Sequence, residues 1–249
     1  MGLKSVLARL RGSKKQRARI DGVAQPMQGV NPYWRAMSDD EVAAGEHRTF
    51  VGGAWDEIGP LQLEFLKKQG LKPDHTLIDI GCGALRGGRH FVRYLDGGNY
   101  YGLDINASLL DAGRGELAAE GLLDKKPTLL ANDKFELRLF ETHFDFGISV
   151  SVFTHIYMNH ILRCLVEMAA VMTETSRYYI TFFEAPLSNH LDPITHQPGG
   201  YTTTFDANPF HYSFEEMEWL ARKAGLEVEL IGDWGHPRNQ KMLCFTRGR

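Results

Sequence analysis

From residue 54 onward, apolar runs of strand length alternate with segments of helical periodicity, and this alternation limits the fold more than any other feature. Alternating strands and helices build a mostly parallel sheet with helices on both faces. We therefore predict an α/β protein with a doubly wound, seven-stranded sheet. The predicted strands are 76–80, 99–104, 127–131, 145–150, 177–183, 226–232 and 240–246, and the predicted helices are 54–69, 86–95, 107–121, 157–172 and 213–224.

The last two predicted strands are joined by about seven residues with no helix between them. Because a parallel crossover needs a dozen residues or more, the last strand is predicted to run antiparallel. The helix before this pair is well marked. Ser213 and Glu216 have the spacing of a capping box, and Gly225 stands where a helix ends.

The 249 residues are 43% apolar, which is enough for one large domain with appendages. We assign residues 1–50 to a basic arm and irregular leader, and residues 51–249 to the main domain. Residues 184–212 form a long irregular segment, which predicts a lid over the site or a homodimer contact. Three widely spaced cysteines predict no disulfide framework, so a cytoplasmic protein is expected.

Residues 1–20 contain seven Lys and Arg residues and no acid, although the net charge of the chain is −3. Apolar residues in this stretch recur on one face of a helix. This pattern is typical of an arm that binds a membrane surface or a protein, of an organellar presequence, or of a solvated terminus. The remaining chain is acidic and has no basic groove with interleaved aromatics, which argues against nucleic acid as a partner.

The segment LIDIGCGALRGG, residues 77–88, places a glycine-rich turn directly after a buried strand. Gly81 and Gly83 allow a tight turn and bring backbone N–H groups close to a ligand. Asp104 ends the next strand, where a carboxylate accepts hydrogen bonds from two ribose hydroxyls. Asn132 and Asp133 end the third strand. Polar residues at the ends of successive strands predict a nucleotide-like cofactor.

The glycine spacing is G-x-G-x-x-x-G, which differs from the dinucleotide fingerprint G-x-G-x-x-G. Arg86 occupies the place of the third glycine of that fingerprint. Asp79, two residues before Gly81, suits a ligand with an ammonium group better than a diphosphate. An NAD-dependent oxidoreductase is therefore the alternative rather than the first choice, and a non-catalytic cofactor-binding scaffold is a second alternative.

The motifs LIDIGCG and YYGLDI resemble motifs I and II of class I S-adenosylmethionine-dependent methyltransferases. FDFGISVSVFTHI is similar to their fourth motif, and KMLCF to their antiparallel seventh strand. The resemblance covers about residues 50–249, and part of this range is similar to a largely uncharacterised bacterial subgroup. One departure is Leu85, which replaces the usual third glycine of D-x-G-x-G-x-G.

The resemblance implies S-adenosylmethionine as the cofactor and S-adenosylhomocysteine as its product. Asp79, Gly81 and Gly83, with Cys82 between the glycines, would line the methionine part, and Arg86 would face the cofactor, the substrate or solvent. The remaining implied cofactor contacts are Asp104 at the ribose, Ile105 at the adenine, Asn132 or Asp133 at its amine, Val150 and Ser151 beside the sulfur, and Trp55 as a cover or a core residue.

The expected reaction is methylation of oxygen or nitrogen on a small-molecule acceptor by in-line displacement, which requires alignment, exclusion of water and removal of a proton. His155 is the first candidate for the general base, because it follows the fourth strand and histidine titrates near neutrality. His211 and His236 are further candidates in the later loops. No recognised metal-ligand spacing occurs, so no metal is expected.

Overall fold

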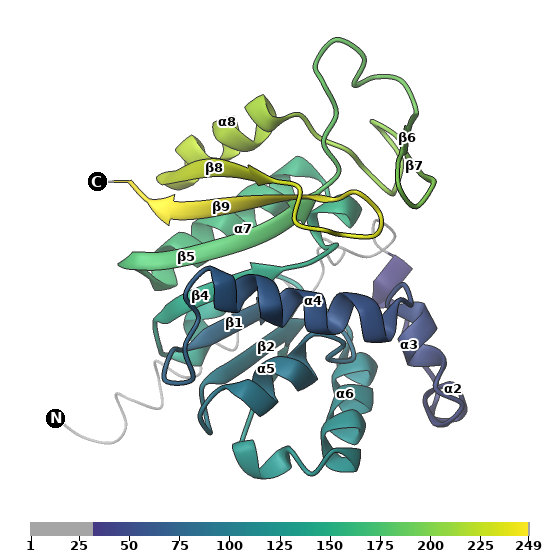
Figure 1. The fold of residues 1–249 in the computed structure, drawn as a ribbon, viewed down its shortest axis with the longest axis vertical. Helices are drawn as coiled ribbons and strands as arrows, with labels where there is room; N and C mark the ends of the chain where they lie inside the picture. The colour runs from purple at the N-terminus through teal and green to yellow at the C-terminus, as the bar shows by residue number, and fades with distance from the viewer. Residues whose placement is uncertain (1–31, 249) are drawn as a thin grey trace, which may run out of the picture.

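The computed structural model describes residues 32–248, and a seven-stranded sheet crosses its centre (Figure 1). The strand order is β3-β2-β1-β4-β5-β9-β8, and β9 pairs antiparallel with both of its neighbours. This sheet confirms the predicted fold class, including the direction of the last strand. The strands are β1 (Leu77–Ile80), β2 (Tyr100–Asp104), β3 (Thr128–Ala131), β4 (Phe144–Ser149), β5 (Met172–Phe182), β8 (Leu226–Gly232) and β9 (Lys241–Arg247).

Helices cover both faces of the sheet, as Figure 1 shows. One face carries α4 (Trp55–Lys68), α5 (Gly88–Tyr94) and α6 (Ala107–Ala119), and the other carries α7 (Met158–Val171) and α8 (Phe214–Ala224). Neighbouring residues of one strand point to opposite faces. Tyr178 therefore belongs to the core beneath α7 and α8, while Tyr179 belongs to the core beneath α4 and α5.

The predicted elements agree with the observed ones to within a few residues, except at β5. This strand begins at Met172 because α7 ends at Val171 and the chain continues directly into the sheet. The predicted capping box of α8 is present, since Ser213 Oγ accepts from the Glu216 N–H and the Glu216 carboxylate accepts from the Ser213 N–H. Gly225 ends this helix in the left-handed conformation.

Several short elements were not predicted, because each is too brief to show a period. The leader contains the 3₁₀ turn η1 (Pro32–Trp34) and the helices α2 (Asp39–Ala43) and α3 (Glu46–Phe50), and β6 (Ile194–His196) pairs with β7 (Tyr201–Thr203) inside the segment 184–212. Three further 3₁₀ turns are η2 (Leu123–Lys125), η3 (Leu137–Phe140) and η4 (Phe153–His155).

The basic stretch 1–20 lies outside the described residues, so its predicted role as an arm stays a prediction. Between residues 32 and 248, no helix is both long enough and apolar enough to cross a membrane.

Candidate functional site

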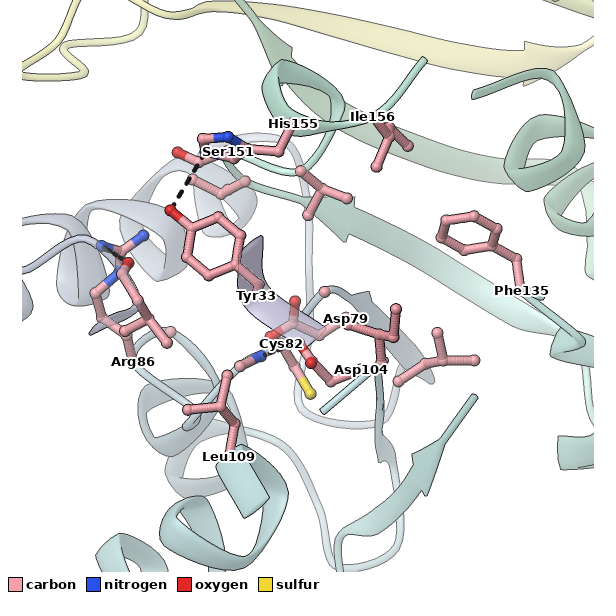
Figure 2. Close-up of a pocket in the computed structure, with 18 of the residues that line it drawn as sticks. Tyr33, Asp79, Cys82, Arg86, Asp104, Leu109, Phe135, Ser151, His155 and Ile156 are labelled. Atoms are coloured by element: carbon pink, nitrogen blue, oxygen red, sulfur yellow. Dashed lines mark hydrogen bonds between the residues drawn. The ribbon is translucent and has the colours of Figure 1, made fainter. Parts of the chain in front are cut away.

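A cavity opens at the carboxyl ends of β1, β2 and β4, where the chain leaves neighbouring parallel strands in different directions (Figure 2). The cavity brings together most of the predicted site residues: Asp79, Gly81, Cys82, Gly83, Arg86, Asp104, Ile105, Asn132, Asp133, Val150, Ser151 and His155. Other lining residues were not predicted, and they include Tyr33, Gln62, Leu109, Phe135 and Arg238.

The glycine turn after β1 has the backbone that only glycine adopts readily. Gly81 and Gly83 have φ angles of 76° and 54°. A Cβ atom at Gly81 would lie 2.3 Å from Cγ2 of Val152, and one at Gly83 would lie 3.0 Å from Cγ1 of Val51. The two glycines therefore let the turn fit between these neighbouring segments while it borders the cavity.

Asp104 ends β2 as a buried carboxylate that orders the turn. Its Oδ2 accepts from the Gly83 N–H at 2.8 Å, and its Oδ1 accepts from the Asn106 N–H at 2.8 Å. Burial raises its pKa to about 6, although the hydrogen bonds from Asn106, Gly83 and Ile105 act in the opposite direction. Each carboxylate oxygen can accept two hydrogen bonds, so the three backbone donors leave Asp104 with acceptor capacity for a ligand in the cavity.

Asp79, at the centre of β1, is a second buried carboxyl on the same cavity, 4% exposed. The Tyr100 hydroxyl donates to its Oδ2 at 2.9 Å. No described residue donates to Oδ1. Burial raises the pKa of Asp79 to about 7, which the Tyr100 hydrogen bond partly offsets. A cationic group placed beside Oδ1 would stabilise the ionised form.

Arg86 forms part of the wall at one side of the cavity. Its Nη1 donates to the backbone carbonyls of Val51 at 3.2 Å and Gly53 at 2.8 Å. The side chain is thereby fixed next to the segment before α4. Burial is the main cause that lowers its pKa to about 10, and the nearby Arg238 adds to that effect.

His155 reaches the cavity from η4, directly after the fourth strand. Its Nδ1 lies 2.5 Å from the amide oxygen of Asn208, and its Nε2 lies 3.5 Å from the Tyr33 hydroxyl. Because a carbonyl oxygen only accepts, Asn208 favours the tautomer with the proton on Nδ1. Burial lowers the pKa of His155. At neutral pH, Nε2 therefore carries a lone pair on the side toward Tyr33.

The leader closes one side of the cavity through Tyr33, which Figure 2 shows between Arg86 and Asp79. Asn106, the N-cap of α6, donates from Nδ2 to the carbonyls of Tyr33 at 2.9 Å and Arg35 at 2.8 Å. The Met37 N–H donates to Ser108 Oγ at 2.9 Å. The leader is thus tied to the first turn of α6, immediately after Asp104.

Some predicted residues use their polar groups within the protein. Ser151 donates its hydroxyl to Gln240 Oε1 at 3.0 Å and its N–H to Thr181 Oγ1 at 2.7 Å. The Asn132 amide oxygen accepts from the backbone N–H groups of Lys134 and Glu136. Asp133 makes no such bond, so it is the more available of the two polar residues after β3.

Three predicted residues, Trp55, His211 and His236, do not line the cavity. Trp55 packs between the guanidinium groups of Arg48 and Arg89, 5.3 Å and 5.4 Å from its ring. His211 is buried inside the segment 184–212, where its ring contacts Thr203 Oγ1 and the His190 carbonyl.

His236 packs against Trp234, and its Nδ1 accepts from the Arg238 N–H, while the Arg238 side chain reaches the cavity.

In residues 32–248, no group of three or more His, Cys, Asp or Glu side chains is arranged to hold a metal ion.

Comparisons with known proteins agree with this geometry. A family model described as a methyltransferase domain matches residues 78–178. An S-adenosylmethionine-dependent methyltransferase from Clostridium acetobutylicum ATCC 824 is similar, with a TM-score of 0.60, 11% identity, and coverage of 84% of this chain and 99% of that one. Magnesium protoporphyrin IX methyltransferase (ChlM) from Synechocystis PCC 6803 with bound SAH has a TM-score of 0.55, 15% identity, and coverage of 84% and 86%. DesVI from Streptomyces venezuelae has a TM-score of 0.58, 17% identity, and coverage of 85% and 99%.

At these identities the solved structures establish the fold alone. The predicted resemblance is confirmed by the matched domain model and by the fold, whereas the bacterial subgroup stays a prediction. Residues 78–178 match the model of a methyltransferase domain, and the chain has the class I fold of S-adenosylmethionine-dependent methyltransferases.

Proposed function

We propose that this chain transfers a methyl group from S-adenosylmethionine to an oxygen or nitrogen atom of a small organic acceptor. The observation that carries the proposal is the single cavity in which the glycine turn, Asp79 and Asp104 lie together with His155. The first three are groups that hold an adenosyl amino acid, and the fourth is a group that accepts a proton.

The residues of the cavity fit the cofactor. Asp104 keeps acceptor capacity for the ribose, although its backbone bonds are made. Asp79 has one oxygen without a donor, which suits the ammonium of the methionine part. Ile105 and Phe135 provide apolar surface on the side where Asp133 lies, which suits an adenine ring.

When bound, S-adenosylmethionine supplies a methyl group on a positively charged sulfur, and the acceptor atom displaces that sulfur. His155 is the proposed general base, because its Nε2 has the lone pair and borders the cavity. Nε2 would accept the proton of the acceptor as the acceptor atom gains the methyl group from sulfur, so S-adenosylhomocysteine and the methylated acceptor would be the products.

A small acceptor is supported by the closure of the cavity. Tyr33 occupies one side of it, and Asn208 of the segment 184–212 reaches His155 at the rim. ChlM, which has a similar fold, is named for a small-molecule acceptor, magnesium protoporphyrin IX. The proposed lid role of 184–212 rests on Asn208 and on Tyr201, whose ring lies 4.4 Å from the Arg238 guanidinium.

The first test is thermal unfolding with S-adenosylmethionine, S-adenosylhomocysteine or NAD, using the wild type, Asp104→Ala and the control Asp111→Ala. Asp111 lies on exposed α6 surface, and its side chain pairs with Arg114. Ligand at one hundred times Kd adds about 2.7 kcal/mol, or roughly 5–11 °C in Tm. We expect shifts with both S-adenosyl ligands that Asp104→Ala abolishes and Asp111→Ala keeps. A shift with NAD alone would contradict the proposal.

A further inference from the structure

Two arginines face the same end of the cavity without an acidic partner. Arg86 bonds to backbone carbonyls, as described above, and the Arg238 guanidinium donates from Nη2 to the Gly52 carbonyl and lies against the Tyr201 ring. The ion pairs found among residues 32–248 include neither side chain. Two cations so close together, one of them 8% exposed, leave an uncompensated positive charge in the wall.

The charge of Arg238 acts at the acceptor end of the cavity. It adds to the burial that lowers the pKa of Arg86 and of His155, and it opposes the burial that raises the pKa of Tyr33. Asp79, by contrast, acts on Arg86. Figure 2 shows Arg86 and Phe135 on opposite sides of the site, with Asp79 and Asp104 between them. Arg86 is therefore the arginine nearer the methionine part, and Arg238 is coupled to the proposed base.

An amide beside Arg86 helps to separate the roles of the two arginines. Gln62 of α4 is 3% exposed and lines the cavity. A Cβ atom at Gly87, directly after Arg86, would lie 2.4 Å from Gln62 Oε1, so this amide lies beside Arg86. Gln62 therefore belongs with Arg86 to the methionine part, which leaves Arg238 as the cation toward the acceptor.

This inference rests on the proposed function, in which the cavity binds S-adenosylmethionine. The ammonium of the cofactor matches Asp79, and its carboxylate matches Arg86. The sulfonium and Arg238 remain as two positive charges near the acceptor. A neutral acceptor would leave both uncompensated in a buried site, whereas an acceptor with a carboxylate neutralises one of them and is attracted by both.

We propose that Arg238 forms a carboxylate-binding subsite, and that the acceptor is therefore an organic acid. The Arg238 guanidinium has five N–H donors. The Gly52 carbonyl accepts from Nη2, so other donors remain for a carboxylate. Held there, the acid lies beside His155, which fixes the direction from which its hydroxyl or amino group approaches the methyl group.

The carboxylate could also come from the cofactor, and binding to S-adenosylhomocysteine separates the two sources. We would measure its Kd by titration calorimetry, together with that of its decarboxylated analogue, for the wild type, Arg238→Gln and the control Arg93→Gln. Arg93 lies outside the cavity and pairs with Glu120. We expect both variants to stay within about threefold of the wild type. Weakening of about tenfold in Arg238→Gln, seen with S-adenosylhomocysteine but not with its decarboxylated analogue, would assign Arg238 to the cofactor and overturn the proposal.

The acceptor arm uses protein saturated with S-adenosylhomocysteine and matched acids and amides: salicylate with salicylamide, anthranilate with anthranilamide, and lactate with lactamide. At least one acid should bind about tenfold more tightly than its amide. Arg238→Gln should remove that preference, Arg238→Lys should keep part of it, and Arg93→Gln should leave it unchanged. Acids that bind no better than their amides, or a preference that survives in Arg238→Gln, would overturn the subsite. If the wild type does not bind S-adenosylhomocysteine, the proposed function itself fails, and this inference with it.

Discussion

Asn208 changes the pKa of His155 through a hydrogen bond to its ring. Burial lowers the pKa of His155, and the hydrogen bond from its ring to Asn208 raises it in part. We therefore expect His155 to titrate below its ordinary value of 6.5 and to be neutral at pH 7. Asn208→Ala removes the raising contribution, so the pKa of His155 should fall further. Titration by NMR of the ring resonances, assigned with His155→Gln, measures both values.

If Asn208 only supports the segment 184–212, its removal would destabilise the protein without moving the pKa of His155. Where an acceptor is found, His155→Gln should lower kcat by about 10²–10⁴-fold and leave the Kd of S-adenosylhomocysteine unchanged. The acid limb of the pH profile should lie below pH 6.5 in the wild type and move lower in Asn208→Ala.

A second prediction for a single residue concerns Asp79. The ionisation of its carboxyl decides how tightly an ammonium group binds. Its pKa in the free protein is raised to about 7, mainly by burial. Binding of S-adenosylhomocysteine requires the ionised carboxylate, so its affinity should fall by up to about tenfold per pH unit below 7 and level off above it. Asp79→Asn should bind weakly and should lose the pH dependence centred near 7, keeping only that of Asp104, whose pKa is about 6. Calorimetry in buffers of different ionisation enthalpy should also show that binding near pH 6 releases a proton, and equal proton release in Asp79→Asn would contradict this account.

Among the elements, the glycine turn and α6 are fitted to one another around Leu85. This residue occupies the place of a usual glycine, has a φ angle of 64° and is fully buried. Its side chain is accommodated by glycines on two helices. A Cβ atom at Gly113 of α6 would lie 2.7 Å from Leu85 Cγ, and one at Gly88 of α5 would lie 2.8 Å from Leu85 Cδ2. The glycine missing from the turn is thus compensated by glycines that face it.

Gly113→Ala should therefore destabilise the protein, although alanine is the better helix former. The clash with Leu85 should cost about 1–3 kcal/mol, against about 1 kcal/mol gained from helix propensity. Gly115→Ala is the matched control, because Gly115 lies on the same helix with no atom near its Cβ position, and it should be neutral or stabilising. Urea denaturation of both variants measures the difference. Equal stability of the two would show that the fit around Leu85 is loose.

Across the whole molecule, the predictable part is what repeats or follows a local rule. The strand and helix alternation predicted the doubly wound seven-stranded sheet, and the Ser213 capping box and Gly225 predicted the limits of α8. Asp79 and Asp104 were predictable at the site because each ends or interrupts an apolar strand.

Tyr33, Gln62 and Arg238 were not predicted, although all three line the cavity. They come from the leader, from α4 and from the loop between β8 and β9, and tertiary packing alone brings them together. His236, in the loop between β8 and β9, was predicted to act on the acceptor. Arg238 of the same loop is the residue whose side chain lines the cavity. No local pattern distinguishes two polar residues of one loop.

In the absence of ligand, the buried carboxyl of Asp79 should lower the free energy of unfolding of the whole molecule in a pH-dependent way. The pKa of Asp79 is raised from 3.8 to about 7 in the folded protein, so the folded state holds this proton more tightly than the unfolded chain does. Between pH 4 and 7 this carboxyl therefore lowers the free energy of unfolding as the pH rises, and its cost is complete above pH 7. Buried histidines act in the opposite direction, since lowered pKa values such as those of His196 and His236, about 4 and 3, favour folding at higher pH.

Comparison of the wild type with Asp79→Asn isolates the carboxyl, because the histidines are common to both proteins. Asparagine keeps an oxygen that accepts from the Tyr100 hydroxyl but does not ionise. The free energy of unfolding of Asp79→Asn should therefore exceed that of the wild type by an amount that grows from near zero at pH 4 to roughly 4 kcal/mol above pH 7. Urea denaturation at each pH gives this difference, and a difference that does not change with pH would rule the explanation out. Saturating S-adenosylhomocysteine should reverse the order above pH 7, because only the wild type then has a carboxylate to pair with the ammonium.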